Sequence, residues 1–436
     1  MLSGMLSDLL SIYRSSDIGA LDRLLGRTLS RDENIERTVH DILEDVRGRG
    51  IDAALDWTRK LDGAQLNSRT IEVSREEIDE AYGQADPEFI RALKRAADNI
   101  RSFHQKQARH SQIDFQPGTA LGQMVRPIAR AGIYAPGGTA GYPSSVLMNA
   151  IPAKVAGVGE IVMVTPPGAD GRVSCALSLI AADIAGVDRV FKIGGAQAVG
   201  ALAYGAGSIP AVDKITGPGN AYVAEAKRQV FGRVGVDSVA GPSEVFIIAD
   251  ESATPEWLAA DLLAQAEHDP LAAAVLATTS MKIAEATRAA AYRQFDRRSR
   301  KSILERSLSA YGRIIVVDSV EQAVELANEA APEHLELAIS DPFAWLGRIR
   351  NAGAVFLGHH TPESVGDYIA GPNHVLPTSG TARFFSPLSV DDFIKKISVV
   401  YYSPDALVNC ADDIELLALG EGLDAHAHAA TVRVRT

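Results

Sequence analysis

Gln265 and His268 form a pair of side chains with the chemistry and the spacing of metal ligands. They end a stretch, 257–268, in which apolar residues recur at helical intervals, so both side chains share one helix face. Pro270 stops that predicted helix, because proline cannot continue the backbone hydrogen-bond ladder. An amide oxygen and a neutral imidazole suit a borderline cation such as zinc. The pattern is equally compatible with two polar residues that cap or solvate a helix end.

A second set of candidate residues contains acids and imidazoles. Glu333 and His334 are adjacent and precede an apolar run, and such a pair can move protons near neutral pH when its surroundings tune it. In the loop 366–374, Asp367 offers a hard oxygen ligand among turn residues. The alternatives are a surface pair at a strand start and an Asx-turn beside an exposed histidine. Four further histidines receive no role from the residues alone: His359, His360, His426 and His428.

Glycines cluster in three turns that adjoin predicted strands, at 134–138, 194–197 and 217–220. Each alone is an ordinary tight turn, and none completes the dinucleotide fingerprint, which needs a third glycine and a later acid. Three such turns at the carboxyl ends of strands in one parallel sheet favour a binding site, because ligands of open α/β sheets bind at that edge. The N–H groups at the following helix starts would receive a pyrophosphate.

Alternating β-branched and alanine-rich runs predict the elements that position these residues. From about residue 125 to 239 we expect strands at 161–164, 190–193 and 213–215 and helices at 176–185, 196–204 and 222–231. A second series predicts strands at 245–249, 273–278, 314–317 and 354–357 and helices at 256–268, 283–292 and 320–329. This alternation implies βαβ units, so the predicted fold is α/β with two parallel-sheet modules. Residues 1 to about 110 are predicted to be helical, and a small tail ends the chain.

Composition restricts the classes of function. The 436 residues are too many for one ordinary core, so we expect several domains. The net charge of −12 argues against a phosphate-binding surface for nucleic acid. Cys175 and Cys410 have no ligand spacing and form no disulfide framework, which fits a reducing compartment. No apolar run approaches the roughly 20 residues that span a bilayer, and no signal peptide is recognised, so we expect a cytoplasmic enzyme without membrane partners.

Short motifs follow one another in a characteristic order. They are Pro-Gly-Gly-Thr-Ala at 136, Gly-Gly-Ala-Gln-Ala at 194, Gly-Pro-Gly-Asn-Ala at 217, Ala-Gly-Pro-Ser-Glu at 240, Gln-Ala-Glu-His-Asp-Pro at 265, Ala-Pro-Glu-His-Leu at 331, Gly-Asp-Tyr at 366, Asn-His-Val-Leu-Pro-Thr at 373 and Leu-Asp-Ala-His at 423. From about residue 30 to the end, this string resembles the L-histidinol dehydrogenase family. Eight or more motifs in order make a chance match implausible.

The resemblance implies an enzyme that oxidises L-histidinol through L-histidinal to L-histidine, with two NAD and one Zn²⁺ per subunit. It implies an atypical Rossmann-like fold and Glu333 with His334 as the proton-transfer pair. The implied zinc ligands are Gln265, His268, Asp367 and His426. The implied NAD contacts are Tyr134, Gln197 and Asn220. The implied substrate contacts are Ser243, His334 and Glu421 together with the zinc ligands.

The resemblance also implies a homodimer whose active sites are shared, because the tail of one subunit reaches the site of the other. We therefore expect a helical N-terminal region (1–125) packing in part on the second module, an NAD-binding module (126–239), a second module with most metal and catalytic residues (240–380) and an exchanged tail (381–436). Two alternatives stay open. One is a paralogue for another small polar alcohol such as a sulfonated diol, although Glu421 suits a cationic amine. The other is a binding protein with a structural zinc, against which the Glu333–His334 pair argues.

Overall fold

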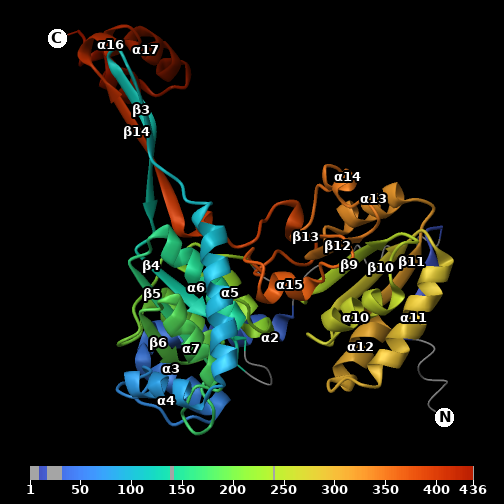
Figure 1. Ribbon diagram of the computed structural model, residues 1–436. Helices are drawn as coiled ribbons and strands as arrows, with labels where there is room; N and C mark the ends of the chain where they lie inside the picture. The colour runs from blue at the N-terminus through green and yellow to red at the C-terminus, as the bar shows by residue number, and fades with distance from the viewer. Residues whose placement is uncertain (1–8, 17–31, 138–141, 239–240, 436) are drawn as a thin grey trace.

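A computed structural model describes the protein over residues 9–16, 32–137, 142–238 and 241–435. Gly138 of the first glycine turn and Ala240 of the motif at 240 lie outside the described residues. Figure 1 shows two α/β modules next to each other and a long arm that projects from the first of them. The predicted α/β class is confirmed, and every strand of the two predicted series starts and ends within two residues of an observed strand.

The first module is a parallel sheet with the strand order β6–β5–β4–β7–β8. Its strands are β4 (Arg130–Tyr134), β5 (Glu160–Thr165), β6 (Arg189–Lys192), β7 (Lys214–Thr216) and β8 (Gly235–Val236). Helices α8 (Gly195–Tyr204) and α9 (Ala221–Val230) cover one face, and α6 (Pro143–Ala156) and α7 (Ala176–Ala185) cover the other. Both faces are therefore buried, as the apolar strand sequences require.

Four N-terminal helices complete these two layers. Helices α2 (Glu33–Arg49) and α3 (Ile51–Asp62) join the core on the α8 side, and α4 (Arg75–Gln84) and α5 (Pro87–Gln105) join the core on the α6 side. Helix α2 begins where Asp32 accepts hydrogen bonds from the N–H groups of Asn34 and Ile35. Its buried residues Val39, Ile42, Leu43 and Val46 form one stripe at helical spacing. The predicted N-terminal helices are thus confirmed from residue 33 onward.

The second module is a parallel sheet with the strand order β1–β11–β10–β9–β12–β13. Its strands are β1 (Ser11–Arg14), β9 (Glu244–Ala249), β10 (Ala273–Thr278), β11 (Gly312–Val316), β12 (His334–Ala338) and β13 (Ala354–Leu357). Helices α10 (Pro255–Ala266), α11 (Met281–Phe295) and α12 (Lys301–Tyr311) share the core on one face. Helices α13 (Val320–Ala330) and α14 (Phe343–Leu346) pack on the other, and α15 (Glu363–Tyr368) lies between the modules (Figure 1).

The strand β1 corrects one prediction. Residues Ser11–Arg14 belong to the region predicted as helical, yet they pair in parallel with β11 at the edge of the second sheet. The preceding Leu9 and Leu10 are buried in the core of the same module. The strand forms because β11 offers unpaired backbone groups, and this opportunity exists only in the folded chain.

The arm consists of an antiparallel sheet and three short helices. Strand β3 (Thr119–Pro127) pairs along its full length with β14 (Ile394–Tyr402) and on its other side with β2 (Gln112–Gln116). The base of the arm meets the first module, where η3 (Val390–Phe393) packs against α6. The tip carries α16 (Pro404–Val408), α17 (Ala411–Gly420) and α18 (Asp424–Thr431) (Figure 1). Strands of nine residues span about 30 Å, so the tip lies far from its own first module.

Candidate functional site

The Glu333–His334 pair lies at the amino end of β12 and is buried, with 6% and 4% of its surface exposed. The alternative of a surface pair at a strand start is therefore wrong. The His334 Nδ1 lies 3.2 Å from the carbonyl oxygen of Glu244, and a carbonyl only accepts, so Nδ1 carries the proton and donates it. Its Nε2 has no hydrogen-bond partner within the described part of the chain. Burial lowers the pKa of the His334 imidazole to about 3, so the ring is neutral and Nε2 carries no proton.

The Glu333 carboxylate faces the start of β9. Its Oε2 accepts a hydrogen bond of 2.9 Å from the N–H of Glu244 and lies 3.7 Å from Nδ1 of His334. Burial holds the pKa of the Glu333 carboxyl well above its usual range, although the N–H of Glu244 and the side chain of Ser243 oppose that shift. A carboxylate with a raised pKa is a stronger base than an exposed one. Glu333, His334 and Ser243 therefore form one proton-handling group at the amino edge of the second sheet.

A candidate metal centre lies beside this group. One side-chain atom each of His268, Glu363 and Asp367 comes within 4.8 Å of the other two. Helix α15 presents Glu363 and Asp367 one turn apart, so both carboxylates share one face. The predicted helix 257–268 is too long, because α10 ends at Ala266 and His268 lies just beyond it. The residues that follow α10 still bring His268 to α15, with the Nε2 of His268 4.0 Å from Oε1 of Glu363.

Gln265 is fully buried behind this cluster. Its amide nitrogen donates to both Glu363 oxygens, at 2.7 and 2.9 Å, in the orientation assigned here, because the reverse would set the amide oxygen against two acceptors. The alternative in which Gln265 is a solvated helix end is therefore wrong. Of the sequence pair, His268 lies beside Asp367, and Gln265 contacts Glu363 of the same cluster.

The electrostatics of the cluster favour a bound cation. Burial raises the pKa of Asp367 to about 6, an effect that the nearby His268 opposes. Burial also holds the pKa of Glu363 well above its usual range, and the neighbouring carboxylates of Asp367 and Glu333 add to the shift. Crowded, desolvated carboxylates are stabilised by a divalent ion, which replaces the lost hydration. An imidazole, carboxylates and an amide oxygen are donors that zinc accepts, so the residues fit this metal.

The three predicted cofactor residues lie at the carboxyl edge of the first sheet. The Tyr134 hydroxyl accepts a hydrogen bond of 2.9 Å from the N–H of Gly195 at the start of α8. The side chain of Gln197 is fully buried, and neither of its amide atoms has a partner among the described residues. Asn220 caps α9 by accepting from the N–H groups of Tyr222 and Val223 in the first turn of that helix. An unpaired buried amide beside a glycine-rich helix start fits a dinucleotide.

A buried ion pair holds the glycine turn that precedes α9. The N–H of Gly217 donates to Asp237 at 2.8 Å, and its carbonyl accepts from the Lys227 ammonium at 3.0 Å. Lys227 and Asp237 also form a close ion pair with side chains only 3% and 6% exposed. A side chain on Gly217 would stand 2.2 Å from the carbonyl oxygen of Tyr134, and its φ of +112° favours glycine as well. The turn is thus rigid and leaves its backbone close to the sheet edge.

Two predicted site residues are not brought to the cluster within one chain. Glu421 and His426 are exposed and lie at the tip of the arm, Glu421 at the end of α17 and His426 in α18 (Figure 1). The arm projects away from the second module, which carries Gln265, His268 and Asp367 (Figure 1). The predicted set therefore separates into a core group and an arm group.

Comparison with known proteins agrees with this geometry. The model of the family described as histidinol dehydrogenase matches residues 25–434. The chain belongs to the histidinol dehydrogenase family. It is 54% identical to a histidinol dehydrogenase from Heliobacterium mobile, over 95% of this chain and 97% of that one, and 53% identical to one from Caldanaerobacter subterraneus subsp. tengcongensis, over 98% and 99%. The crystal structure of histidinol dehydrogenase from Elizabethkingia anophelis superposes with a TM-score of 0.93 at 39% identity, covering 98% of each chain.

This member of the histidinol dehydrogenase family contains site residues that sequence reasoning missed. Glu363 stands four positions before Asp367, so helical spacing alone could have found it. The histidine of the loop 366–374, His374, is partly buried rather than exposed, with Nδ1 3.0 Å from the carbonyl oxygen of Asp367 and Nε2 3.3 Å from Oγ of Ser145. No sequence pattern indicates that contact, because Ser145 belongs to the first module.

Proposed function

We propose that this protein is an NAD- and zinc-dependent histidinol dehydrogenase, which oxidises L-histidinol through L-histidinal to L-histidine in histidine biosynthesis. The observation that carries the proposal is the free Nε2 of the neutral His334, which lies 3.9 Å from the Asp367 carboxylate of the candidate metal centre. A base beside a cation-binding cluster suits oxidation of an alcohol that must be both anchored and deprotonated. Family membership supplies the identity of the alcohol.

The first oxidation needs a base for the hydroxyl proton, and His334 fills that role. Its Nδ1 keeps its proton and donates it to the Glu244 carbonyl, which fixes the ring and leaves Nε2 to accept a proton from the substrate. The second oxidation needs a water molecule to add to the aldehyde. Glu333, with its raised pKa, takes the proton from that water. Because both groups are buried, the aldehyde is kept away from bulk water between the two oxidations.

The zinc would be held by Gln265, His268 and Asp367 and by His426 from the arm of a second copy of the chain. When bound, it would anchor and orient the polar substrate. Ser243 and the arm residue Glu421 would contact the substrate, and a carboxylate such as Glu421 suits a cationic amine.

The cofactor would lie along the module 126–239, held by Tyr134, Gln197 and Asn220. Its nicotinamide ring supplies a hydride acceptor in each of the two oxidations. The proton-transfer pair and three zinc ligands belong to the segment 240–380, in the module next to the cofactor module (Figure 1).

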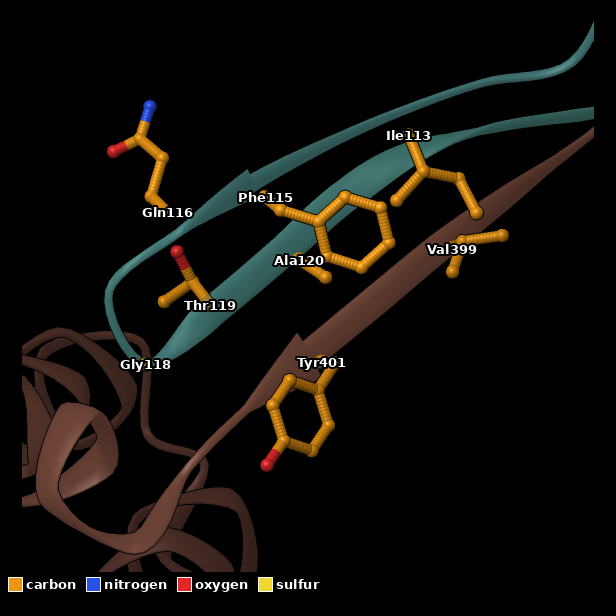
Figure 2. A pocket seen from close by; sticks show the side chains of 8 residues that line it. All are labelled: Ile113, Phe115, Gln116, Gly118, Thr119, Ala120, Val399 and Tyr401. Carbon is orange, nitrogen blue, oxygen red and sulfur yellow. The ribbon is translucent and has the colours of Figure 1, made fainter.

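The same proposal includes a homodimer in which the segment 381–436 is exchanged. The arm exposes large apolar side chains, among them Phe115 (77%), Val400 (71%) and Leu416 (73%). Figure 2 shows a hollow on one face of its sheet, lined by residues that include Ile113, Phe115 and Tyr401. Contiguous apolar surface of this kind marks an interaction site, and a second copy is the partner that would also return His426 to a metal centre.

Among the described residues, none of the helices combines the length and the apolar character that a membrane-spanning helix needs.

The direct test is NADH formation by the purified protein. We expect L-histidinol to yield two NADH per molecule, and other small polar alcohols, including a sulfonated diol, to yield little. Activity should fall on treatment with a chelator and return with zinc. Preference for another alcohol would assign the chain to a different substrate, and zinc binding without any turnover would indicate a structural metal site.

A further inference from the structure

Among the residues of the candidate metal centre, Glu363 contacts both helix α10 and strand β12 from the start of α15. It is the first residue of α15, and only 3% of its surface is exposed. Its backbone N–H donates to Oε1 of Glu336 at 2.9 Å, so β12 fixes where α15 begins. Its carboxylate, in turn, receives the amide nitrogen of Gln265. Glu363 therefore connects α10, α15 and β12 within the cluster.

The orientation of the Gln265 amide matters because only its oxygen can bind a cation. The two ends of an amide have nearly the same shape, so packing alone does not decide which end faces the metal. A carboxylate in its ionised form, which a bound cation stabilises, decides it, since it accepts hydrogen bonds and cannot donate them. Both oxygens of Glu363 accept from the Gln265 nitrogen, at 2.7 and 2.9 Å, which turns the Gln265 oxygen away from Glu363.

We propose that Glu363 is a positioning residue, which locks Gln265 with its amide oxygen directed at the metal. The inference rests on the proposed zinc site. The competing role is direct ligation, because one Glu363 oxygen lies within 4.8 Å of the ligand atoms of His268 and Asp367. Positioning is favoured because both Glu363 oxygens are already used by Gln265, and direct ligation would take one acceptor from that buried amide.

The first test is metal affinity, measured on the intact protein by competition with a chromophoric chelator for Zn²⁺. Loss of a group that orients a ligand typically weakens metal binding by about 10–100-fold, so we expect that loss for Glu363→Gln. The glutamine keeps the size of the side chain, but two facing amides can pair in either orientation. The control is Glu267→Gln, which removes a charge that acts on His268 without touching the Gln265 amide. We expect less than a threefold change in zinc affinity for the control. Equal losses of affinity in the two variants would overturn the proposal, because removal of a negative charge alone would then explain the effect.

The second test separates positioning from ligation by repeating the substitution in a Gln265→Ala background. If Glu363 acts through Gln265, Glu363→Gln causes no further loss of affinity there. If Glu363 binds the metal directly, the loss is the same in both backgrounds, and the proposal fails. Cobalt absorption spectra of the four proteins provide a second readout, because a displaced amide changes the coordination. These measurements need no substrate, so a protein that binds zinc but does not oxidise histidinol would refute the proposed activity while still testing Glu363.

Discussion

Exchange of the arm between subunits predicts that two inactive variants restore each other. His426 lies in α18 at the arm tip, whereas Glu333 lies at the start of β12 in the second module. The arm strands alone extend about 30 Å from the first module and point away from the second (Figure 1). We therefore combine His426→Ala, a lesion of the arm, with Glu333→Ala, a lesion of the core. Each variant alone should be inactive.

The magnitude of the rescue follows from the pairing of the chains. When the two variants are unfolded together and refolded at equal concentration, half of the dimers are mixed if the chains pair at random. In a mixed dimer with exchanged arms, one site receives both lesions and the other receives neither. Half of the dimers then have one intact site of two, so the mixture should reach about a quarter of wild-type activity, given independent sites.

The assay is NADH formation after refolding, with the fraction of mixed dimers measured by differently tagged chains. The matched control replaces the arm lesion with a second core lesion, Asp367→Ala mixed with Glu333→Ala. Every core then carries one lesion, so exchange cannot restore a site and activity should stay absent. If mixed dimers of His426→Ala and Glu333→Ala form fully and remain inactive, each arm serves its own chain and the shared-site hypothesis is refuted.

Four further outcomes are expected. Chelation should abolish turnover but leave the protein folded, because the metal residues lie on separate elements of large cores. Thermal unfolding monitored by circular dichroism should therefore stay cooperative, and complete unfolding on chelation would indicate a structural metal. Glu333→Gln should slow the second NADH of a single turnover more than the first, and equal slowing would remove the assigned role of Glu333. Asp237→Ala should lower the free energy of unfolding by about 3–5 kcal/mol in urea titrations, because it leaves the Lys227 ammonium buried without its carboxylate. Replacing both Lys227 and Asp237 by apolar residues should recover most of that loss. Burial raises the pKa of Asp261, which lies beside Glu336, to about 6 from 3.8, so the stability that its neutral form provides is complete below pH 4 and is lost as pH rises through 6. Between pH 4 and 8, urea titrations should show wild type losing stability relative to Asp261→Asn, and parallel profiles would contradict this.

Many strands and helices of both modules were predictable from the chain alone, although β4, β8 and α6 were not predicted. Runs such as 161–164 and 273–277 are apolar without interruption, because a parallel sheet buries both faces, and this composition is visible without a structure. The candidate chemistry was equally visible in the types and spacing of Gln265, His268 and Asp367. Secondary structure and the residue types of the candidate site depend on neighbouring residues in the sequence, so local sequence patterns indicate them.

Only the tertiary structure decided how these groups meet. Strand β1 and the arm strand β14 form by pairing with β11 and β3, which are hundreds of residues away along the chain, and no local pattern specifies such partners. The neutral state of His334 depends on burial, and its tautomer depends on the Glu244 carbonyl, which is 90 residues away in sequence. Burial, pairing and the pKa of a side chain are properties of the surroundings that folding creates, which is why residue types and spacing alone do not determine them.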